Sequence, residues 1–375
     1  MAGTQLRASN AHSMSQKNEW LQVLRAIAAL MVVLFHASQY WQAIPALHPA
    51  REMAHWGFAG VDIFFVLSGY VVWTSADKPA FSGGAFLIRR GLRIYLGYWP
   101  VLALFVIWYL LTRKPEALPM QHAVGSVLLL NIWVFDNWLP TAWSLPYELY
   151  FYLWIALLCT AFPSRWRGLA LLLVFLLLAG WTTWTAVRLP HLVQHNVQPF
   201  MFLATPLGLE FLGGALLARG HVHLRRGNAH WRTFMSAVIL LGLALAAIGF
   251  SWGQSAPAFD RVYVLRTASF GLFGFGLVLA VLAISELNWR APRFLVAIGD
   301  SSYSLYLIHP LLFVALNWLG QGVSTQSLWR ISLNLFNLVA VVFLAWQWYL
   351  WVEKPVFERA TRRKNDRAHD SCAVA

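Results

Sequence analysis

Apolar runs long enough to cross a lipid bilayer recur along almost the whole of this 375-residue chain. A helix that crosses the hydrocarbon core needs about 17 to 25 predominantly apolar residues. Runs of this kind predict about ten spans, and we expect an all-α, multi-pass membrane protein. The predicted spans lie near residues 20–38, 58–74, 97–112, 146–162, 168–187, 199–218, 234–252, 267–285, 302–320 and 329–352.

The composition excludes several other classes of protein. Hydrophobic residues make up 59% of the chain and charged residues 11%, whereas about 25% of an average globular protein is charged. The formal charge of +13 would suit a nucleic-acid partner, but the basic residues lie in short segments between apolar runs, so none is expected. Cys159 lies in an apolar run and Cys372 in the polar tail, which implies neither a disulfide framework nor a cysteine zinc site.

The distribution of Lys and Arg predicts the orientation of the spans. Basic residues accumulate on the cytoplasmic side of membrane proteins, and ten spans place most of them on one side if the N-terminus is inside. Both termini are therefore expected in the cytoplasm. The first 19 residues lack the apolar core of a cleavable signal, so the first run is expected to remain as an anchor. The predicted domains are a polar N-terminal tail at 1–19, a membrane domain at 20–358 and a polar basic tail at 359–375.

A further apolar segment, residues 121–135, is expected to be re-entrant or interfacial. It is short and is followed by the polar sequence Asp136-Asn-Trp-Leu-Pro140. Counting it as a full span would reverse the orientation of every later segment and would spoil the charge bias.

Two residues that a bilayer tolerates poorly, Arg25 and His36, lie in the first apolar run. They are about three helical turns apart, so on a helix both side chains point to the same face, roughly 16 Å apart along the axis. In the predicted orientation Arg25 lies near the cytoplasmic end of the span and His36 near the outer end. One face thus carries a fixed cation and a proton-transfer group at two depths.

Two carboxylates, Asp62 and Glu148, are predicted to lie at the outer level of His36. A carboxylate beside an imidazole fixes the tautomer of the ring and stabilises its protonated form. These three residues, with Arg25, are therefore candidate catalytic groups. In the alternative interpretation, they bind only one another and tie helices together.

Three arginines, Arg89, Arg90 and Arg93, lie in a cytoplasmic segment of the predicted topology. If the segment is helical, Arg90 and Arg93 are neighbours on one face, and arginine forks suit phosphate oxygens. Charge bias alone also makes such segments basic, which is the simpler explanation. Arg25 adds a further cation, just inside the membrane from the same cytoplasmic surface. A ligand with several phosphates and a long flexible arm would reach from these arginines towards His36.

Tyr303, Tyr306 and His309 recur every three residues on the ninth predicted span, ahead of Pro310, which should loosen the backbone ladder. This polar stripe either lines a cavity, where it would bind substrate, or is a hydrogen-bonded packing face. Glu210 lies in the middle of the sixth span, where an isolated carboxylate would be protonated or paired. We expect a structural role for it.

Six short motifs together resemble those of the acyltransferase 3 family of bacterial membrane O-acyltransferases. They occur in the family's order between residue 20 and about residue 358. They are Leu24-Arg25 followed by His36, Gly60-Val-Asp-Ile-Phe-Phe-Val-Leu-Ser-Gly-Tyr70, Arg89-Arg-Gly-Leu-Arg-Ile-Tyr95, Trp143-Ser-Leu-Pro-Tyr-Glu148, Ser302-Tyr-Ser-Leu-Tyr-Leu-Ile-His-Pro310 and Glu353-Lys-Pro355.

The resemblance implies transfer of an acyl group, usually acetyl, from cytoplasmic acetyl-CoA to a hydroxyl of a cell-envelope glycan, in the bacterial inner membrane. It implies that His36 is the catalytic histidine, that Arg25 is essential, and that Arg90 and Arg93 lie near coenzyme A. Acyl-CoA would be a co-substrate and no cofactor would be bound. The chain ends soon after Glu358, so the stand-alone type without a soluble esterase-like domain is expected. Any second transfer step would need another, polysaccharide-assembly protein.

The polar residues of the spans and the resemblance to the family both suggest the same mechanism. Coenzyme A phosphates bind the arginines, the thioester reaches into the bilayer, and His36 either takes the proton of the sugar hydroxyl or carries the acyl group itself. The serine-hydrolase elbow, the Walker loop and the His-Glu-x-x-His zinc motif are absent from the sequence. The alternative from another class is a proton-coupled transporter or flippase of a solute or lipid-linked glycan. The lack of matching Gly/Pro-broken segments in two halves speaks against it.

Overall fold

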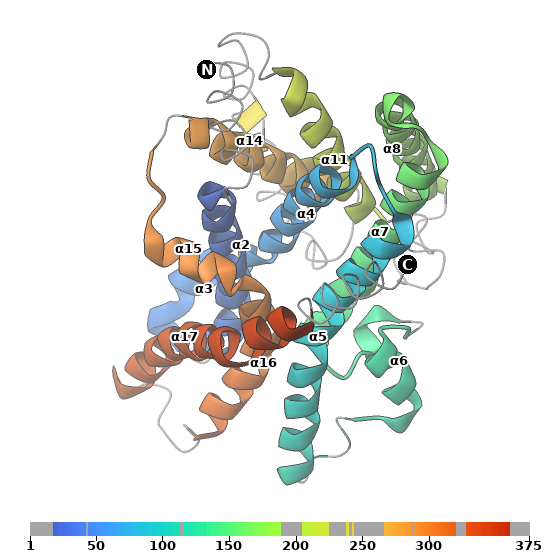
Figure 1. The fold of residues 1–375 in the computed structure, drawn as a ribbon. Coiled ribbons are helices and arrows are strands. Elements are labelled where there is room, and N and C mark those ends of the chain that lie inside the picture. The colour runs from blue at the N-terminus through green and yellow to red at the C-terminus, as the bar shows by residue number, and fades with distance from the viewer. Residues whose placement is uncertain are drawn as a thin grey trace, which may run out of the picture.

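The computed structural model is a bundle of helices (Figure 1). It describes residues 18–42, 44–112, 118–131, 133–188, 205–224, 266–286, 289–319 and 328–360, with a few short pieces between them, and these ranges contain no β-strand. The shorter helices are α3 (His48–His55), α6 (Ala123–Leu128) and α15 (Arg293–Asp300). The longer helices are α2 (Glu19–Ser38), α4 (Gly60–Ala76), α5 (Gly83–Leu111), α7 (Leu145–Ala161), α8 (Ser164–Arg188), α11 (Leu207–Leu224), α14 (Leu272–Glu286), α16 (Ser302–Leu319) and α17 (Leu328–Trp348).

The outer faces of several helices are apolar. Leu177 of α8 is 73% exposed and Val339 of α17 is 69% exposed, which suits contact with lipid better than contact with water. Among the described residues, five helical stretches are long and apolar enough to cross a membrane: Glu19–Trp41, Pro45–Ala76, Gly83–Leu111, Ser164–Thr185 and Trp329–Ala360. The chain is thus a helical membrane protein, as predicted. The predicted span at 234–252 lies almost entirely outside the described residues, so the count of ten and the position of the termini stay predictions.

Helix α5 begins at Gly83, well before the predicted start of its span at residue 97. Ser82 has an extended backbone, and its hydroxyl accepts a hydrogen bond from the backbone N–H of Ala85 at 3.4 Å, as an N-cap does. The helix then runs through the arginine segment into the apolar run without a break. A search for apolar runs does not detect the polar first turns of a helix, which is why the predicted start was late. Because the segment is helical, Arg90 and Arg93 lie on one helical face, as predicted.

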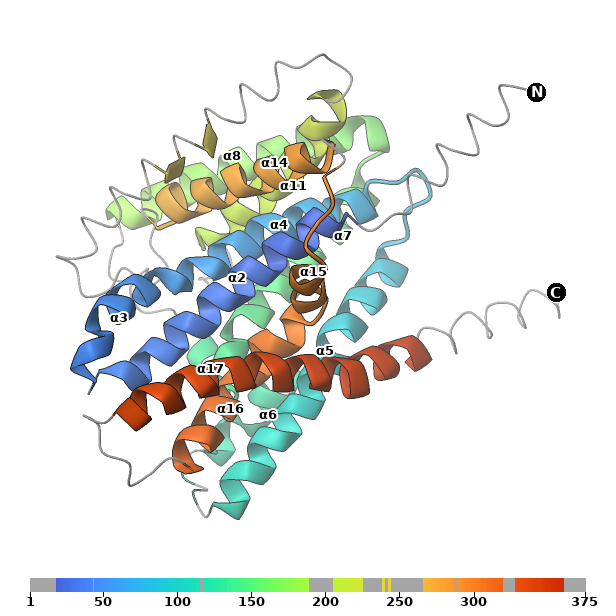
Figure 2. The same cartoon turned by 90° about the vertical axis from the view of Figure 1, so that its left-hand side faces the viewer.

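Helices α4 and α11 approach each other closely through two glycines. A Cβ atom on Gly69 would overlap the carbonyl oxygen of Phe211, and a Cβ atom on Gly214 would overlap that of Val66. Small residues allow such close contact between helices in a membrane. Helix α4 also contacts α2 and α14, and Figure 2 shows it beside both of them and α11. The residues of α4 are therefore surrounded by protein.

The segment at 121–135 folds back along the bundle. Its helix α6 has six residues, too few to cross a bilayer. The carbonyl groups at the end of α6 have no partner within the helix, and three aromatic side chains from the middle of α5 donate to them at 2.5 to 3.0 Å. Tyr98 donates to the carbonyl oxygen of Ser126, Trp99 to that of Val127, and Tyr95 to that of Leu128. The short helix fits a segment that is re-entrant or interfacial, and which of the two it is stays a prediction.

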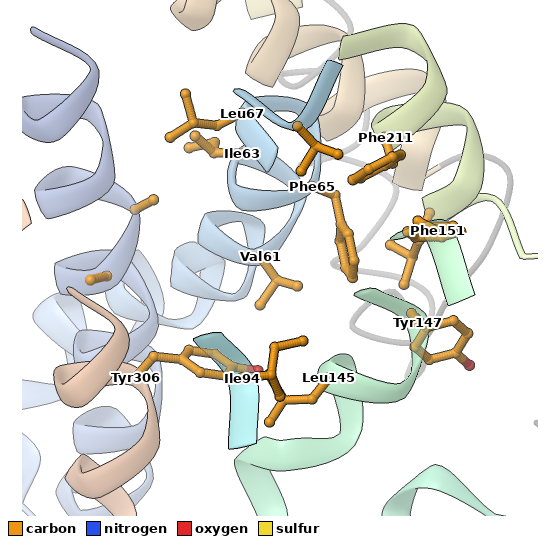
Figure 3. Packing of buried hydrophobic residues seen from close by; sticks show 14 of the residues in the cluster. Val61, Ile63, Phe65, Leu67, Ile94, Leu145, Tyr147, Phe151, Phe211 and Tyr306 are labelled. Carbon is orange, nitrogen blue, oxygen red and sulfur yellow. The ribbon is translucent and has the colours of Figure 1, made fainter. Parts of the chain in front are cut away.

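The buried core contains many aromatic side chains (Figure 3). Phe151 of α7 stacks on Phe211 of α11 with ring centroids 4.9 Å apart. Figure 3 also shows Tyr306 of α16 close to Ile94 of α5 and Leu145 of α7. These last three residues form part of the wall of a cavity.

Candidate active site

A cavity of about 140 Å³ lies among α2, α4, α5, α7 and α16. One part of its wall is apolar and includes Val61, Phe64, Phe65, Val71, Val72 and Leu145. The other part is polar and includes Arg25, Arg90, Arg93, Glu148, Tyr303 and Tyr306. The structure thus brings together the predicted phosphate-binding arginines, one candidate catalytic carboxylate and two residues of the polar stripe.

Two of the arginines are held by hydroxyl groups. Arg25 donates from Nε to Oγ of Ser302 at 3.1 Å. Arg90 donates to Oγ of Ser75 at 2.7 Å, and its guanidinium lies 5.5 Å from the ring centroid of Tyr152. Both of these hydrogen bonds are to uncharged hydroxyl groups and not to carboxylates.

Arg93 is held by a carboxylate that the sequence analysis missed. It donates to Oε1 of Glu353 at 2.9 Å, and Glu353 is only 4% exposed. The other oxygen of Glu353 accepts a hydrogen bond from Ser304. Glu353 ends the π-helical turn Tyr349–Glu353 that follows α17. It stands in the Glu353-Lys-Pro355 motif, but such a short motif does not reveal that its carboxylate is buried.

The cavity carries an excess of positive charge. Among the residues that line it, three guanidinium groups meet one carboxylate, that of Glu148. Two further carboxylates act on these arginines from outside the lining: Glu353 pairs with Arg93, and Asp300 acts on Arg25. The surroundings are partly apolar, which strengthens the attraction for an anion. Arg89 is exposed and does not line the cavity, so the structure separates it from Arg90 and Arg93. Of the three arginines predicted from this segment, only Arg90 and Arg93 line the cavity, and Arg25 joins them there.

Glu148 lies among the arginines of the cavity, and Tyr152 donates a hydrogen bond to it. Within the described part of the chain, no hydrogen bond joins it to His36. The first turn of α7 contributes Leu145 and Glu148 to the cavity wall. Ser144, directly before α7, is hydrogen-bonded to the hydroxyl of Tyr306 at 2.7 Å.

Asp62 binds Arg266 and not His36. The guanidinium donates from Nε to Oδ1 at 2.9 Å and from a terminal nitrogen to Oδ2 at 2.7 Å, a two-pronged geometry. The side chains are 0% and 2% exposed. Glu210, also wholly buried, accepts a hydrogen bond from Thr267 at 3.0 Å. Nothing in the sequence near Asp62 or Arg266 indicates that the two residues are partners.

Replacing Arg266 by methionine should strongly destabilise the protein, because the buried Asp62 would lose its counter-charge. Removing one partner of a buried ion pair costs about 3 to 5 kcal/mol. The thermal unfolding midpoint of the purified protein in detergent should fall, and adding Asp62→Leu should recover part of the loss. Glu52→Gln, which breaks the exposed pair with Arg51, is the control. An unchanged midpoint for Arg266→Met would contradict the role of the ion pair.

His36 contacts another histidine, His309. Nδ1 of His36 lies 3.2 Å from Nε2 of His309, and the ring centroids are 4.8 Å apart. His309 is wholly buried, whereas His36 is partly exposed. The sequence analysis assigned His309 to a substrate-binding stripe and did not predict this contact, because periodicity places residues on a face of one helix without showing what the face meets.

Tyr306 lies between the cavity and the two histidines. Its hydroxyl group bonds Ser144 at the cavity wall, and its ring centroid lies 6.3 Å from that of His309. Tyr303, one turn earlier, donates its hydroxyl to the carbonyl oxygen of Ile94 at 2.8 Å. Helix α16 therefore leads from the arginine-lined cavity to the histidines. An anion with a long arm, anchored at the arginines, would extend along this helix.

Comparisons with known proteins gave one matching family model and several relatives. A family model described as an acyltransferase domain matches residues 18–352. The exopolysaccharide production protein ExoZ of Rhizobium meliloti is 26% identical over 338 residues, which cover 84% of this chain and 96% of that protein. Nodulation protein 10 of Rhizobium leguminosarum is 24% identical over 388 residues, covering 94% and 96%. The peptidoglycan O-acetyltransferase OatA of Listeria monocytogenes is 32% identical over 156 residues, covering 36% and 23%. No solved structure matches.

Proposed function

The chain belongs to the acyltransferase 3 family, and we propose that it transfers an acetyl group from acetyl-CoA to a hydroxyl of a cell-envelope glycan or exported polysaccharide. The observation that carries this proposal is the arginine-lined cavity, whose wall residue Tyr306 also lies against His309 of the histidine pair. The names of two relatives, one for exopolysaccharide production and one for peptidoglycan O-acetylation, support a glycan acceptor.

The donor would bind with its phosphates at Arg25, Arg90 and Arg93. An arginine has five N–H donors in a planar fork, so Arg93 can keep Glu353 and still donate to a phosphate oxygen. The apolar wall, which includes Val71, suits the long arm of the coenzyme. The arm would then run along α16 and bring the thioester past Tyr306.

His36 would act on the thioester in one of two ways. As a general base, it takes the proton of the acceptor hydroxyl while the hydroxyl oxygen bonds to the thioester carbon; the carbon–sulfur bond breaks and the proton passes to the leaving thiolate. As a nucleophile, Nε2 first bonds to the thioester carbon, and the carbon–sulfur bond breaks to release the thiolate. The hydroxyl oxygen then bonds to the acyl carbon, the carbon–nitrogen bond breaks, and the hydroxyl proton balances the thiolate to give the thiol. Both routes produce an ester and the thiol of coenzyme A, and the site supports either.

The donor end of the cavity would face the cytoplasm, in the bacterial inner membrane. Three helix ends lie at one end of the bundle in Figure 2, namely the start of α2, the end of α4 and the end of α17. Helix α5, which carries Arg90 and Arg93 in its first half, begins a few residues after the end of α4, and the charge bias predicts that this end is inside. This orientation places the arginines where soluble acyl-CoA can reach them.

The test is transfer of labelled acetyl from acetyl-CoA in inverted membrane vesicles from a host that makes its native glycans. Vesicles with the protein should move label into the glycan fraction, and mild alkali should release it, as expected of an ester. Vesicles without the protein should not. If the protein instead moves glycan across the membrane without needing the thioester, the transporter alternative is correct and the proposal fails.

A further inference from the structure

The contact between the two histidines has a chemical consequence. We propose that His309 is a positioning residue, which acts with the carbonyl of Val32 to hold the imidazole of His36 in the direction and tautomer that leave Nε2 unprotonated and able to react. This inference rests on the proposed function, because it concerns His36 as a base or an acyl carrier. It assigns His309 to orientation of another side chain and not to binding of substrate.

The hydrogen bonds of His309 set its own tautomer. Its Nδ1 lies 2.9 Å from the carbonyl oxygen of Leu305, one turn earlier on α16. A carbonyl oxygen can only accept a hydrogen bond, so Nδ1 carries the proton. In a neutral imidazole the other nitrogen is then an acceptor. His309 therefore presents the lone pair of Nε2 to the residue that faces it, which is His36.

The neighbours of His36 set its tautomer in turn. Its Nδ1 lies 3.2 Å from Nε2 of His309 and 2.9 Å from the carbonyl oxygen of Val32. Both neighbours are acceptors, so Nδ1 of His36 carries the proton and shares it between them. A neutral His36 then has an unprotonated Nε2. Within the described ranges, no hydrogen bond occupies that nitrogen.

The position of the proton decides whether His36 can react. With the proton on Nε2, the ring could neither take the proton of a hydroxyl nor attack a thioester at that atom, and Nδ1 would face two acceptors without a donor. When Nε2 takes a proton or an acyl group, the ring becomes cationic and its Nδ1–H donates more strongly. The Val32 carbonyl belongs to the same helix as His36. His309 adds a second acceptor from α16 and fixes the direction of the ring.

Three substitutions at position 309 separate this role from simple packing. His309→Gln keeps an amide oxygen at about the position of Nε2, so it can still accept from His36. His309→Asn is polar but too short to reach, and His309→Leu removes the acceptor at similar volume. All three should leave KM for acetyl-CoA unchanged, since His309 does not line the cavity. We expect kcat to fall about 10²- to 10⁴-fold for Leu and Asn, and to stay within about tenfold for Gln.

Several outcomes would overturn the inference. A wild-type kcat in His309→Leu would overturn it. Equal losses of kcat in the Gln, Asn and Leu variants would also overturn it, because that is the result a packing role predicts. A higher KM with unchanged kcat would return His309 to substrate binding. If His309→Leu does not fold, the comparison of Gln with Asn decides, because both are polar.

A second measurement is independent of acyl transfer. The purified protein is treated with diethyl pyrocarbonate, which modifies unprotonated imidazole nitrogen, and the modification of His36 is followed by peptide mass spectrometry. The wild type and His309→Gln should react at similar rates, with His309→Leu and His309→Asn several-fold slower. Equal rates in all four proteins would overturn the inference. Failure of the wild type to transfer acetyl would contradict the proposed function, and this reactivity would still test the role of His309.

Discussion

Replacing His36 by alanine should lower the rate of acetyl transfer by about 10³-fold or more, because it removes the group that takes the proton or carries the acyl group. Binding of coenzyme A should stay within about twofold of the wild type, since His36 does not line the cavity where the arginines lie. Initial rates of label transfer in vesicles, normalised to the amount of protein, measure the first quantity. Calorimetry on the purified protein in detergent measures the second.

The control for His36→Ala is His48→Ala. His48 is exposed, and its ring meets the carbonyl oxygen of Gln42 at 3.3 Å, outside the bundle core. This variant should transfer acetyl at the wild-type rate. Transfer by His36→Ala at the wild-type rate would contradict a catalytic role for His36, whatever the acceptor.

The same wild-type protein can separate the two routes. If His36 carries the acyl group, purified protein mixed with labelled acetyl-CoA and no acceptor should release a burst of thiol equal to the amount of protein. Peptide mass spectrometry should then find the acetyl group on His36. If His36 is a general base, neither the burst nor the adduct should form, because the thioester waits for the hydroxyl.

The sequence predicted those features of the molecule that depend on neighbouring residues. Apolar runs predicted a helical membrane protein, because their length is set by the bilayer. Helical periodicity placed Arg25 with His36, and Arg90 with Arg93, on shared faces, since a face is determined within one helix. The short length of residues 121–135 predicted a segment that does not cross.

The partners of the buried groups could not be predicted, because they depend on contacts between distant helices. Asp62 meets Arg266, which is 204 positions away, and no local pattern marks that pair. Glu148 was predicted at the level of His36 because the depth of a residue was inferred from its place in a straight span. In the structure the first turn of α7 lies at the cavity, and Glu148 lines it together with the arginines instead. His309 was found on the correct face of its helix, but its contact with His36 requires the packing of α16 on α2.

Replacing Arg90 by glutamine should weaken the binding of coenzyme A by about 10- to 150-fold. One hydrogen bond between a charged donor and a phosphate is worth about 1.5 to 3 kcal/mol, and about 1.4 kcal/mol is tenfold in affinity. Arg90 is a better test than Arg93, since loss of Arg93 would also leave the buried Glu353 without its counter-charge. Arg90→Lys should recover only part of the affinity, because it keeps the charge and loses the fork. Calorimetry with coenzyme A itself measures the effect.

Arg89→Gln is the matched control for Arg90→Gln. The two arginines are adjacent in α5 and carry the same charge, but Arg89 is exposed and lies outside the cavity. A long-range effect of charge would weaken binding equally in both variants and would fade at high salt. Direct contact with a phosphate should weaken only Arg90→Gln, at low and at high salt, and equal weakening would contradict the assignment. If Arg90→Gln loses coenzyme A while His36→Ala keeps it and loses transfer, the site has an anchoring end and a reacting end. This division of the site into two ends agrees with the positions of Arg25 and His36, which lie about three turns apart on the same helix, α2.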